Sequence, residues 1–410
     1  MKLIVQPNDG VGPVLQAMAR ARSTIDILIF RLDMPEVLKA LAAAVERGVL
    51  VRALVAHTNK GDEKGLRRLE RELLGIGATV ARTADDLVRY HGKMMIIDGR
   101  AVHVHGFNFT RLDINKSRSF GVISTSRPIV LQAKRLFEAD CTRQPYTADH
   151  ARLIVSPVNA RRRLADFING AKKQLLIYDA NLCDPRMMKL LSERQQQGVD
   201  VRIIGASSGR GALRAEPFPG RRLHVRSIMR DGSRAFIGSQ SLRALELDRR
   251  REVGVFVIER PIVKRMIDVF EQDWAQTAAG RAAAALAEAT AVARAAAAAA
   301  KVAADKVEAL APASDKAAKQ ALTEAETMAD KAKDAAREAE EAARKLAGGD
   351  PHAVVATVIP VNGKPVAVQS LGAVVEDVKA AAREAKGAVK VAEKGAEKGA
   401  EKGAASSPRA

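Results

Sequence analysis

Two short motifs in this chain, at residues 91–98 and 224–231, have the same residue types and spacing. In each, a histidine is followed two residues later by a cation and five residues after that by an aspartate: His91, Lys93 and Asp98 in one, His224, Arg226 and Asp231 in the other. Because side chains alternate along a strand, the histidine and the cation share one face of it. Two such faces brought together would surround a pocket with two imidazoles and two cations. This set suits a phosphodiester: one imidazole attacks phosphorus, the other protonates the leaving oxygen, and the cations hold the phosphate charge.

The repetition extends beyond the motifs. The positions of the two motif histidines differ by 133, and residues 118–122 match residues 251–255 at the same offset. Nearer the N-terminus, the apolar segments 25–30 and 175–178 match at an offset of 150 instead. A repeat on this scale indicates that the chain duplicates one structural unit. The first copy therefore carries about 17 additional residues, which we expect in the 58–71 region.

Small and polar residues complete each motif. The first copy continues with His105, Gly106 and Asn108, and the second with Gly238, Ser239 and Ser241. With these residues the chain resembles the phospholipase D superfamily, whose signature H-x-K-x4-D-x6-G-S-x-N occurs twice in its two-lobed members. The first copy has His-Gly in place of Gly-Ser, and the degenerate second copy has Arg226 for Lys and Ser241 for Asn. The resemblance covers residues 1–277.

The resemblance implies an α/β fold of two duplicated lobes related by pseudo-two-fold symmetry, with the active site between them. The hydrophobic patterns agree, because strand-like and helix-like segments alternate in both halves. Each lobe is expected to close with a helix, at 128–137 and at 261–274. We expect four segments: lobe 1 at residues 1–146, lobe 2 at 147–280, an Ala/Lys/Glu-rich helix at 281–348 and a low-complexity tail at 349–410.

The C-terminal segments differ in composition from the lobes. Residues 281–348 have high helix propensity, but leucine and valine recur too sparsely for a coiled-coil seam. Within the tail, Asn362-Gly363 predicts a short hairpin turn. The tetrapeptide Ala-Glu-Lys-Gly occurs three times in residues 392–403, and we expect this end to be disordered.

The resemblance also implies catalytic roles. In the superfamily one histidine forms a covalent phosphohistidine, and the distal ring nitrogen of each histidine is held by a residue of the opposite lobe, 28 positions after that lobe's own histidine. These positions are Glu252, which the resemblance pairs with His91, and Ser119, which it pairs with His224. A carboxylate fixes the tautomer of the imidazole and leaves its other nitrogen basic. His91 is therefore the expected nucleophile, and His224 the acid and base.

The other motif residues receive supporting roles. The two cations, Lys93 and Arg226, would clamp the non-bridging phosphate oxygens. Neutral donors to the phosphate would come from Asn108 and from Ser239 or Ser241. The two motif aspartates, Asp98 and Asp231, would orient nearby backbone rather than touch the phosphate.

Residue types that bind metals or form disulfides are sparse. His103 and His105 share a strand face, but no carboxylate or cysteine lies at a helpful spacing, so neither a metal nor a cofactor is expected. Cys141 and Cys183 are isolated and indicate reduced thiols in the cytoplasm. The N-terminal apolar run is too short for a signal peptide, and no run of about 18 uncharged apolar residues occurs. A lipid substrate would then be reached peripherally, at the inner membrane surface.

The basic charge is concentrated in the two lobes. The formal net charge is +19, but residues 281–410 contain 20 Lys and Arg against 18 Asp and Glu, so residues 1–280 carry about +17. This distribution favours an anionic ligand or surface. Aromatic residues make up only 3% of the chain, which leaves few platforms for stacking unpaired bases.

Three functions remain open at this point. The first is hydrolysis of phospholipids, or transfer of their phosphatidyl group, because a covalent intermediate can be resolved by water or by an alcohol. The second is the same chemistry on nucleic acid, which the basic lobes favour. The third is a non-catalytic module in which the degenerate second motif binds phosphate and the tail recruits an unidentified protein partner.

Overall fold

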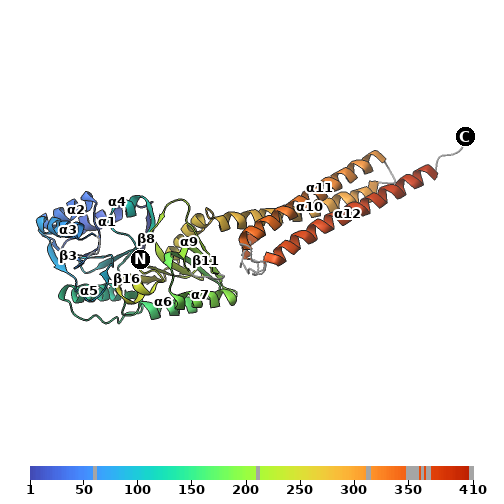
Figure 1. Cartoon of the computed structure of the whole chain (residues 1–410). Coiled ribbons are helices and arrows are strands. Elements are labelled where there is room, and N and C mark those ends of the chain that lie inside the picture. The colour runs from blue at the N-terminus through green and yellow to red at the C-terminus, as the bar shows by residue number, and fades with distance from the viewer. Residues whose placement is uncertain are drawn as a thin grey trace. The chain divides into compact units, whose positions relative to one another are not determined.

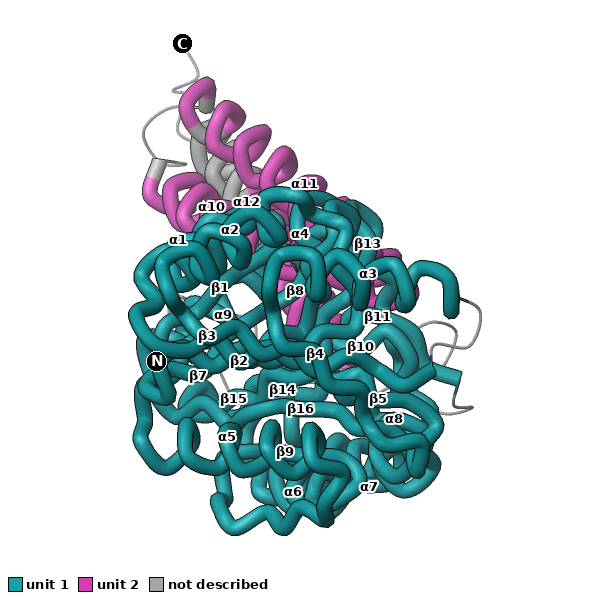
Figure 2. Tube along the Cα trace, turned by 90° about the vertical axis from the view of Figure 1, so that its left-hand side faces the viewer, with its two compact units in different colours: residues 1–277 teal, residues 278–410 magenta. Residues whose placement is uncertain are grey.

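The computed structural model describes residues 1–58, 62–208, 213–310, 315–347, 360–361, 364–365 and 371–405. The chain divides into two compact units, Met1–Thr277 and Ala278–Ala410, drawn in teal and magenta in Figure 2. Both histidine motifs lie in the first unit, so the fold of that unit positions the candidate site.

The first lobe is a sheet whose outer face is covered by helices (Figure 1). Its elements are β1 (Lys2–Gln6), α1 (Gly12–Arg20), β2 (Thr24–Ile29), α2 (Pro35–Glu46), β3 (Leu50–Val55), α3 (Glu63–Gly75), β4 (Thr79–Arg82), β5 (Arg89–Tyr90), β6 (Met94–Ile97), β7 (Ala101–His105), α4 (Arg111–Asn115), β8 (Ser117–Ser124) and α5 (Arg127–Thr142). The strand order is β1-β8-β7-β6-β2-β3-β4, with β2, β3 and β4 parallel. Parallel neighbours require crossovers, which α2 and α3 provide. Apolar residues at helical spacing, such as Val37 and Leu41, pack these helices onto the sheet.

The second lobe repeats this plan. Its elements are β9 (Leu153–Ser156), α6 (Ala160–Asn169), β10 (Gln174–Leu182), α7 (Pro185–Gln196), β11 (Asp200–Ser207), β12 (Ala215–Glu216), β13 (Arg222–Leu223), β14 (Arg226–Arg230), β15 (Arg234–Gly238), α8 (Ala244–Asp248), β16 (Arg250–Val257) and α9 (Arg260–Trp274). The strand order β12-β11-β10-β14-β15-β16 mirrors that of the first sheet. Among the described residues, α3 has no helical counterpart after β11, which accounts for the additional residues of the first copy. The predicted duplicated α/β fold is confirmed.

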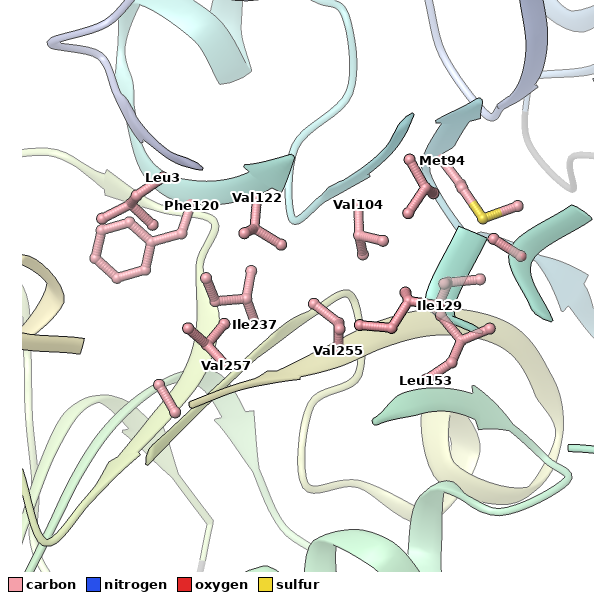
Figure 3. Close-up of a cluster of buried hydrophobic side chains, with 14 of the residues drawn as sticks. Leu3, Met94, Val104, Phe120, Val122, Ile129, Leu153, Ile237, Val255 and Val257 are labelled. Atoms are coloured by element: carbon pink, nitrogen blue, oxygen red, sulfur yellow. The ribbon is translucent and has the colours of Figure 1, made fainter. Parts of the chain in front are cut away.

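The two lobes share one hydrophobic core. Figure 3 shows Val104 and Phe120 of the first sheet opposite Ile237 and Val255 of the second. The closing helices α5 and α9 add apolar side chains to the same cluster. Because side chains of both lobes are buried in one cluster, separating the lobes would expose a large apolar surface to water.

Two buried ion pairs cross between the lobes. Arg118 is bound by Asp273 through two contacts, Nε to Oδ2 at 2.7 Å and Nη2 to Oδ1 at 3.0 Å. At the equivalent positions of the other copy, Nη2 of Arg251 lies 3.1 Å from Oδ1 of Asp140. Burial raises the pKa of Asp140 to about 6. Each pair joins a strand of one lobe to the closing helix of the other, so the two pairs fix the position of one lobe relative to the other.

One short strand of each lobe pairs with the sheet of the other lobe. β5, which precedes His91, pairs in parallel with β16, and β13, which precedes His224, pairs in parallel with β8. The backbone N–H of His91 donates to the carbonyl of Arg251 at 2.8 Å, and that of His224 donates to the carbonyl of Arg118 at 3.1 Å. Both histidines therefore stand at the junction of the two sheets.

The second unit is built from three long helices that lie side by side, α10 (Ala278–Leu310), α11 (Asp315–Ala347) and α12 (Leu371–Ala405) (Figure 1). The single helix predicted over 281–348 is wrong, because two helices cover this range, with residues 311–314 between them. Residues 311–314 lie outside the described residues. The seam is lined by small side chains, such as Ala289 and Ala339, with few larger ones. Alanine, rather than leucine, allows these helices to pack.

The prediction of disorder for the C-terminal repeats is also wrong, because residues 392–403 lie in α12. Alanine, glutamate and lysine are strong helix formers, and a four-residue period is close to one helical turn. Upstream, Val374, Val378 and Ala385 anchor the helix against α10 and α11. Of the hairpin, strands β17 (Pro360–Val361) and β18 (Lys364–Pro365) pair antiparallel, whereas the Asn362-Gly363 turn lies outside the described residues.

One described helix segment, Ala278–Val307, is long and apolar enough to cross a membrane by length and composition alone. Its hydrophobicity comes mainly from alanine, and residues such as Leu286 and Ala293 are buried against the other two helices of the unit. Core helices of water-soluble bundles meet the same two criteria, so this property does not by itself indicate a membrane span.

Candidate active site

His91 follows β5 and is held by a carboxylate of the opposite lobe. Its Nδ1 lies 3.0 Å from both carboxylate oxygens of Glu252, which is wholly buried on β16. The Phe30 ring packs against the imidazole in a T-shaped contact, with 4.7 Å between ring centroids and 72° between the ring planes. The side chain of His91 is 12% exposed, so its position is fixed by contacts on several sides. The predicted pairing of His91 with Glu252 is present in the structure.

Lys93 is buried beside His91. Its Nζ donates to the carbonyl of His91 at 2.7 Å and lies 3.1 Å from the imidazole Nε2. Burial lowers the pKa of Lys93 to about 7, and the opposing charge of Glu252 limits the decrease. The lysine is therefore close to its titration point at neutral pH, and an anion bound next to it would favour the charged form.

The predicted partner of His224 is wrong. The hydroxyl of Ser119 donates to the backbone carbonyl of His224 at 3.2 Å and not to the imidazole. The ring instead faces Asp113 of the first lobe, whose Oδ2 lies 3.3 Å from Nδ1. A serine side chain is too short to replace the expected carboxylate, and α4 brings an aspartate to the same ring nitrogen from six residues earlier in the chain.

Asp113 is the functional-site residue that the sequence did not reveal. It lies beyond Asn108, the last position of the first signature, and is 3% exposed. Its carboxylate also accepts from the backbone N–H and the Nδ2 of Asn108, at 2.8 and 2.7 Å, and pairs with Arg222. Burial acts to raise the pKa of Asp113, but the charge of His224 and the bonds from Asn108 outweigh it and leave the pKa below its ordinary value.

Asn108 has a contact that the sequence did not predict. One N–H of its Nδ2 donates to Asp113, so the amide orients the carboxylate behind His224. In the second copy the equivalent position is Ser241, whose hydroxyl makes a different contact. There, Oγ of Ser241 accepts from Nε of Arg226 at 3.3 Å and fixes the guanidinium.

Arg226 and Ser239 are the second lobe's polar side chains next to His224 and Glu252. Nη1 of Arg226 donates to the carbonyl of His224 at 3.3 Å, just as Lys93 binds the carbonyl of His91. Ser239 is buried next to Glu252, and its Oγ accepts from the backbone N–H of Val253 at 3.2 Å. The substitution of Arg226 for lysine thus keeps both the charge and the contact with the motif histidine.

The two motif aspartates lie at the opposite ends of the strands from the histidines. Asp98 and Asp231 adopt the left-handed conformation, each with φ 52°, and each is followed by a glycine that also has positive φ. The carboxylate of Asp98 accepts from the backbone N–H groups of residues 22–24, and that of Asp231 from those of residues 172–174. Their contacts are with backbone at the start of the neighbouring strand, which makes them structural turn residues.

His103 and His105 lie on β7 in an apolar surrounding, with 5.7 Å between their ring centroids. Burial lowers the pKa of His103 to about 4 and that of His105 well below its ordinary value. No group of three or more metal-binding side chains occurs in the part of the chain that the structure describes. Beside them Gly106 occupies the place of Ser239, and a Cβ there would stand 3.0 Å from Oγ of Ser119.

The two motifs act on each other electrostatically. Burial is the largest cause of the depressed pKa of His91, followed by the charges of Lys93 and then Arg226 of the other lobe. Burial, followed by the charge of Arg226, lowers the pKa of His224 well below its ordinary value, against the opposing charge of Asp113. Both imidazoles are therefore neutral at pH 7, and the charge of each motif cation acts on the histidine of the other motif as well as on its own.

The spacing of the two motifs predicted two imidazoles and two cations acting together, and in the structure each imidazole also has a carboxylate of the opposite lobe within 3.3 Å of Nδ1. A family model described as "Cardiolipin synthase, PLD-like domain" matches residues 14–141 and 164–274, more than half of the chain. The chain belongs to this phospholipase D-like family. The family consists of phosphodiesterases and phosphotransferases, and the two matched segments correspond to the two lobes.

Solved structures share the fold. Polyphosphate kinase from Porphyromonas gingivalis is similar with a TM-score of 0.56 and 20% identity over 66% of this chain and 49% of the kinase, so the match spans about half the kinase's length. Phosphatidylserine synthase from Haemophilus influenzae Rd KW20 is similar with a TM-score of 0.54 and 10% identity over 67% of this chain and 86% of that chain. The phospholipase D family member Nuc from Salmonella typhimurium matches 35% of this chain and 93% of its own, with 21% identity and a TM-score of 0.31.

Proposed function

We propose that this protein hydrolyses phospholipids, or transfers their phosphatidyl group to an alcohol, through a phosphohistidine on His91. The proposal is carried by one observation: each motif histidine has a carboxylate at Nδ1, Glu252 for His91 and Asp113 for His224. This leaves Nε2 of each imidazole available for chemistry on phosphorus.

In the first step Nε2 of His91 attacks phosphorus and the bond from phosphorus to the leaving alkoxide oxygen breaks. That oxygen takes a proton from Nε2 of His224, which must be protonated beforehand. The negative charge of the bound phosphate favours this protonated state, and Asp113 stabilises it. Lys93 and Arg226 hold the non-bridging oxygens, whose charge grows as the bonds rearrange.

In the second step the neutral His224 removes a proton from water or from an alcohol, whose oxygen attacks phosphorus. The phosphorus–nitrogen bond to His91 breaks and the imidazole is released. Water gives the free phosphate monoester, and an alcohol gives a new phosphodiester. The same residues serve both outcomes, because only the entering group differs.

Several features support a lipid substrate. The family model carries the description of a cardiolipin synthase, and one fold neighbour is a phosphatidylserine synthase. The lobes carry about +17 of the net charge, which favours approach to an anionic bilayer surface. We accordingly propose that the protein works in the cytoplasm and contacts the inner membrane surface peripherally.

The test uses the purified full chain with vesicles of phosphatidylcholine or phosphatidylglycerol, in the presence and absence of ethanol. We expect release of the head group, a phosphatidylethanol product when ethanol is present, and loss of both in His91→Ala. His150→Ala is the matched control, because this partly buried histidine lies outside both motifs. Absence of any lipid product, with normal binding of inorganic phosphate, would support the non-catalytic alternative.

The basic surface also favours a second candidate, a phosphodiesterase acting on nucleic acid. A labelled oligonucleotide in the same assay separates the two. Cleavage of the oligonucleotide without lipid turnover would replace the first proposal by the second.

A further inference from the structure

Phe30, at the end of β2, is surrounded by positive charge. The guanidinium carbon of Arg89 lies 5.2 Å from the centre of its ring, that of Arg31 lies 5.6 Å from it, and Nζ of Lys93 lies 5.8 Å from it. The same ring packs against His91. Three cations are thus gathered around one aromatic side chain that touches the expected nucleophile.

Two of these cations are not needed by the chemistry proposed above. Lys93 and Arg226 already supply two positive charges for the single negative charge of one phosphodiester, whereas Arg31 and Arg89 have no role in either step. Among the described residues, neither of these arginines makes a hydrogen bond or an ion pair with a carboxylate, although Glu252 stands near enough to act on Arg89 through its charge.

The duplication provides an internal comparison for Arg89. Its counterpart in the second copy is Arg222, which also stands two residues before a motif histidine and also lies on a strand lent to the other lobe. Arg222 is neutralised by Asp113. Arg89 is half-buried and stands near Arg250 and Arg31 instead, and burial followed by these two charges lowers its pKa.

A cluster of guanidinium groups without its own carboxylate is unfavourable in the empty site and becomes favourable when an anion binds there. Its position next to His91 places that anion beside the reacting phosphate. We propose that Arg89 and Arg31 bind a second phosphate group of the substrate, next to the one held by Lys93 and Arg226, and that a phospholipid carries this group. That a phospholipid carries the second phosphate rests on the proposed function. The existence of the phosphate subsite does not.

Equilibrium binding tests the subsite without turnover. Isothermal titration calorimetry compares inorganic phosphate with pyrophosphate, for the wild-type chain and for Arg89→Gln and Arg31→Gln. We expect the wild type to bind pyrophosphate about tenfold more tightly than phosphate, because a second charged group is bound. Both variants should lose most of this preference. Arg31 is exposed, so its variant tests the subsite even if Arg89→Gln does not fold.

Arg234→Gln is the matched control. Arg234 is an exposed arginine on β15, where it pairs with Arg230 at the end of the hairpin away from Arg226. It should retain the wild-type preference for pyrophosphate. The subsite is overturned if Arg89→Gln and Arg31→Gln both keep the wild-type preference.

Matched substrates then identify the carrier. One pair is phosphatidylglycerol and cardiolipin, which have one and two phosphates, and the other is the dinucleotide TpT and its 5′-phosphorylated form. We expect kcat/KM to favour cardiolipin, and Arg89→Gln to remove this preference. A preference that depends on Arg89 in the nucleotide pair alone would overturn the lipid carrier. Arg89-dependent pyrophosphate binding without any turnover would refute the proposed function and leave the subsite standing.

Discussion

Nδ1 of His224 lies 3.3 Å from Oδ2 of Asp113, a carboxylate that belongs to the opposite lobe. We expect Asp113→Asn to lower kcat/KM by about 10- to 100-fold, because the charge that stabilises the protonated imidazole is lost while the bulk is kept. Ser119→Ala should cost about 1 kcal/mol of stability through the lost hydrogen bond and leave kcat/KM nearly unchanged. Steady-state kinetics on a soluble phosphodiester and thermal unfolding check both. Equal kinetic damage in the two variants would return the partner role to Ser119.

The covalent adduct should form on His91. Glu252 meets Nδ1 of this residue with both oxygens at 3.0 Å, whereas the carboxylate at His224 is shared with Asn108 and Arg222. Rapid quenching and mass spectrometry of the two motif peptides should find phosphorus on His91, with a longer-lived adduct in His224→Ala, because the base that activates water is absent. An adduct on the His224 peptide would reverse the two roles.

The pH dependence of kcat/KM should reflect the ionisation of Lys93. Burial lowers its pKa to about 7, so the ammonium is present below that pH and is lost above it. We expect kcat/KM, which reflects the free enzyme, to fall more steeply with pH above about pH 7 than below it, because the Lys93 ammonium is lost there in addition to the proton of His224. In Lys93→Arg this additional steepness should disappear, because a guanidinium stays charged, although the absolute rate is lower. A profile that is flat from pH 6 to 9 in the wild type would contradict this assignment.

Chelation should leave turnover unchanged. The nucleophile, the acid and the charge stabilisation are all supplied by side chains, so the mechanism has no step for a metal ion. Activity is measured before and after dialysis against EDTA. Loss of activity that a divalent cation restores would direct attention to His103 and His105, whose rings are neutral and close together on β7.

Residues 1–277 should be sufficient for chemistry. They form one compact unit that contains both motifs, Glu252 and Asp113. A variant ending at Thr277 should unfold cooperatively and retain the full-length kcat/KM on a soluble phosphodiester. A folded but inactive product would show that the helical unit contributes to the site.

The sequence was sufficient for the duplicated fold and for the pairing of His91 with Glu252. Both follow from regularities that recur at fixed separations along the chain, and such regularities are visible without coordinates. Asp113 recurs as a carboxylate, Glu246, at the same offset of 133, but it lies beyond the signature, so no role was assigned to it from the sequence. Glu246 pairs with Arg250 and not with an imidazole, so the repeat alone does not give the partner of Asp113. Only the three-dimensional path of α4 brings Asp113 to His224.

The packed helices of the C-terminal unit were not predictable for a different reason. Composition indicated helices, but the sparse leucines and valines gave no reason to expect that they pack against one another. Alanine seams bury little surface per residue, so the pattern that signals a bundle in other sequences is weak here. The low complexity of the charged repeats at the end predicted disorder, although each of their frequent residues except glycine favours a helix.

β5 and β13 each pair with a strand of the opposite lobe. Neither half of the first unit could therefore serve as an enzyme by itself. Cut between residues 146 and 147, each piece would keep a histidine and lose the strand neighbour that holds it. Each piece would also keep one carboxylate that serves the imidazole of the other, Asp113 in the first and Glu252 in the second. Two copies of either half could therefore complete each other across a symmetric contact. The present chain has the reciprocal contacts of such a dimer within one polypeptide, where the two halves differ in sequence.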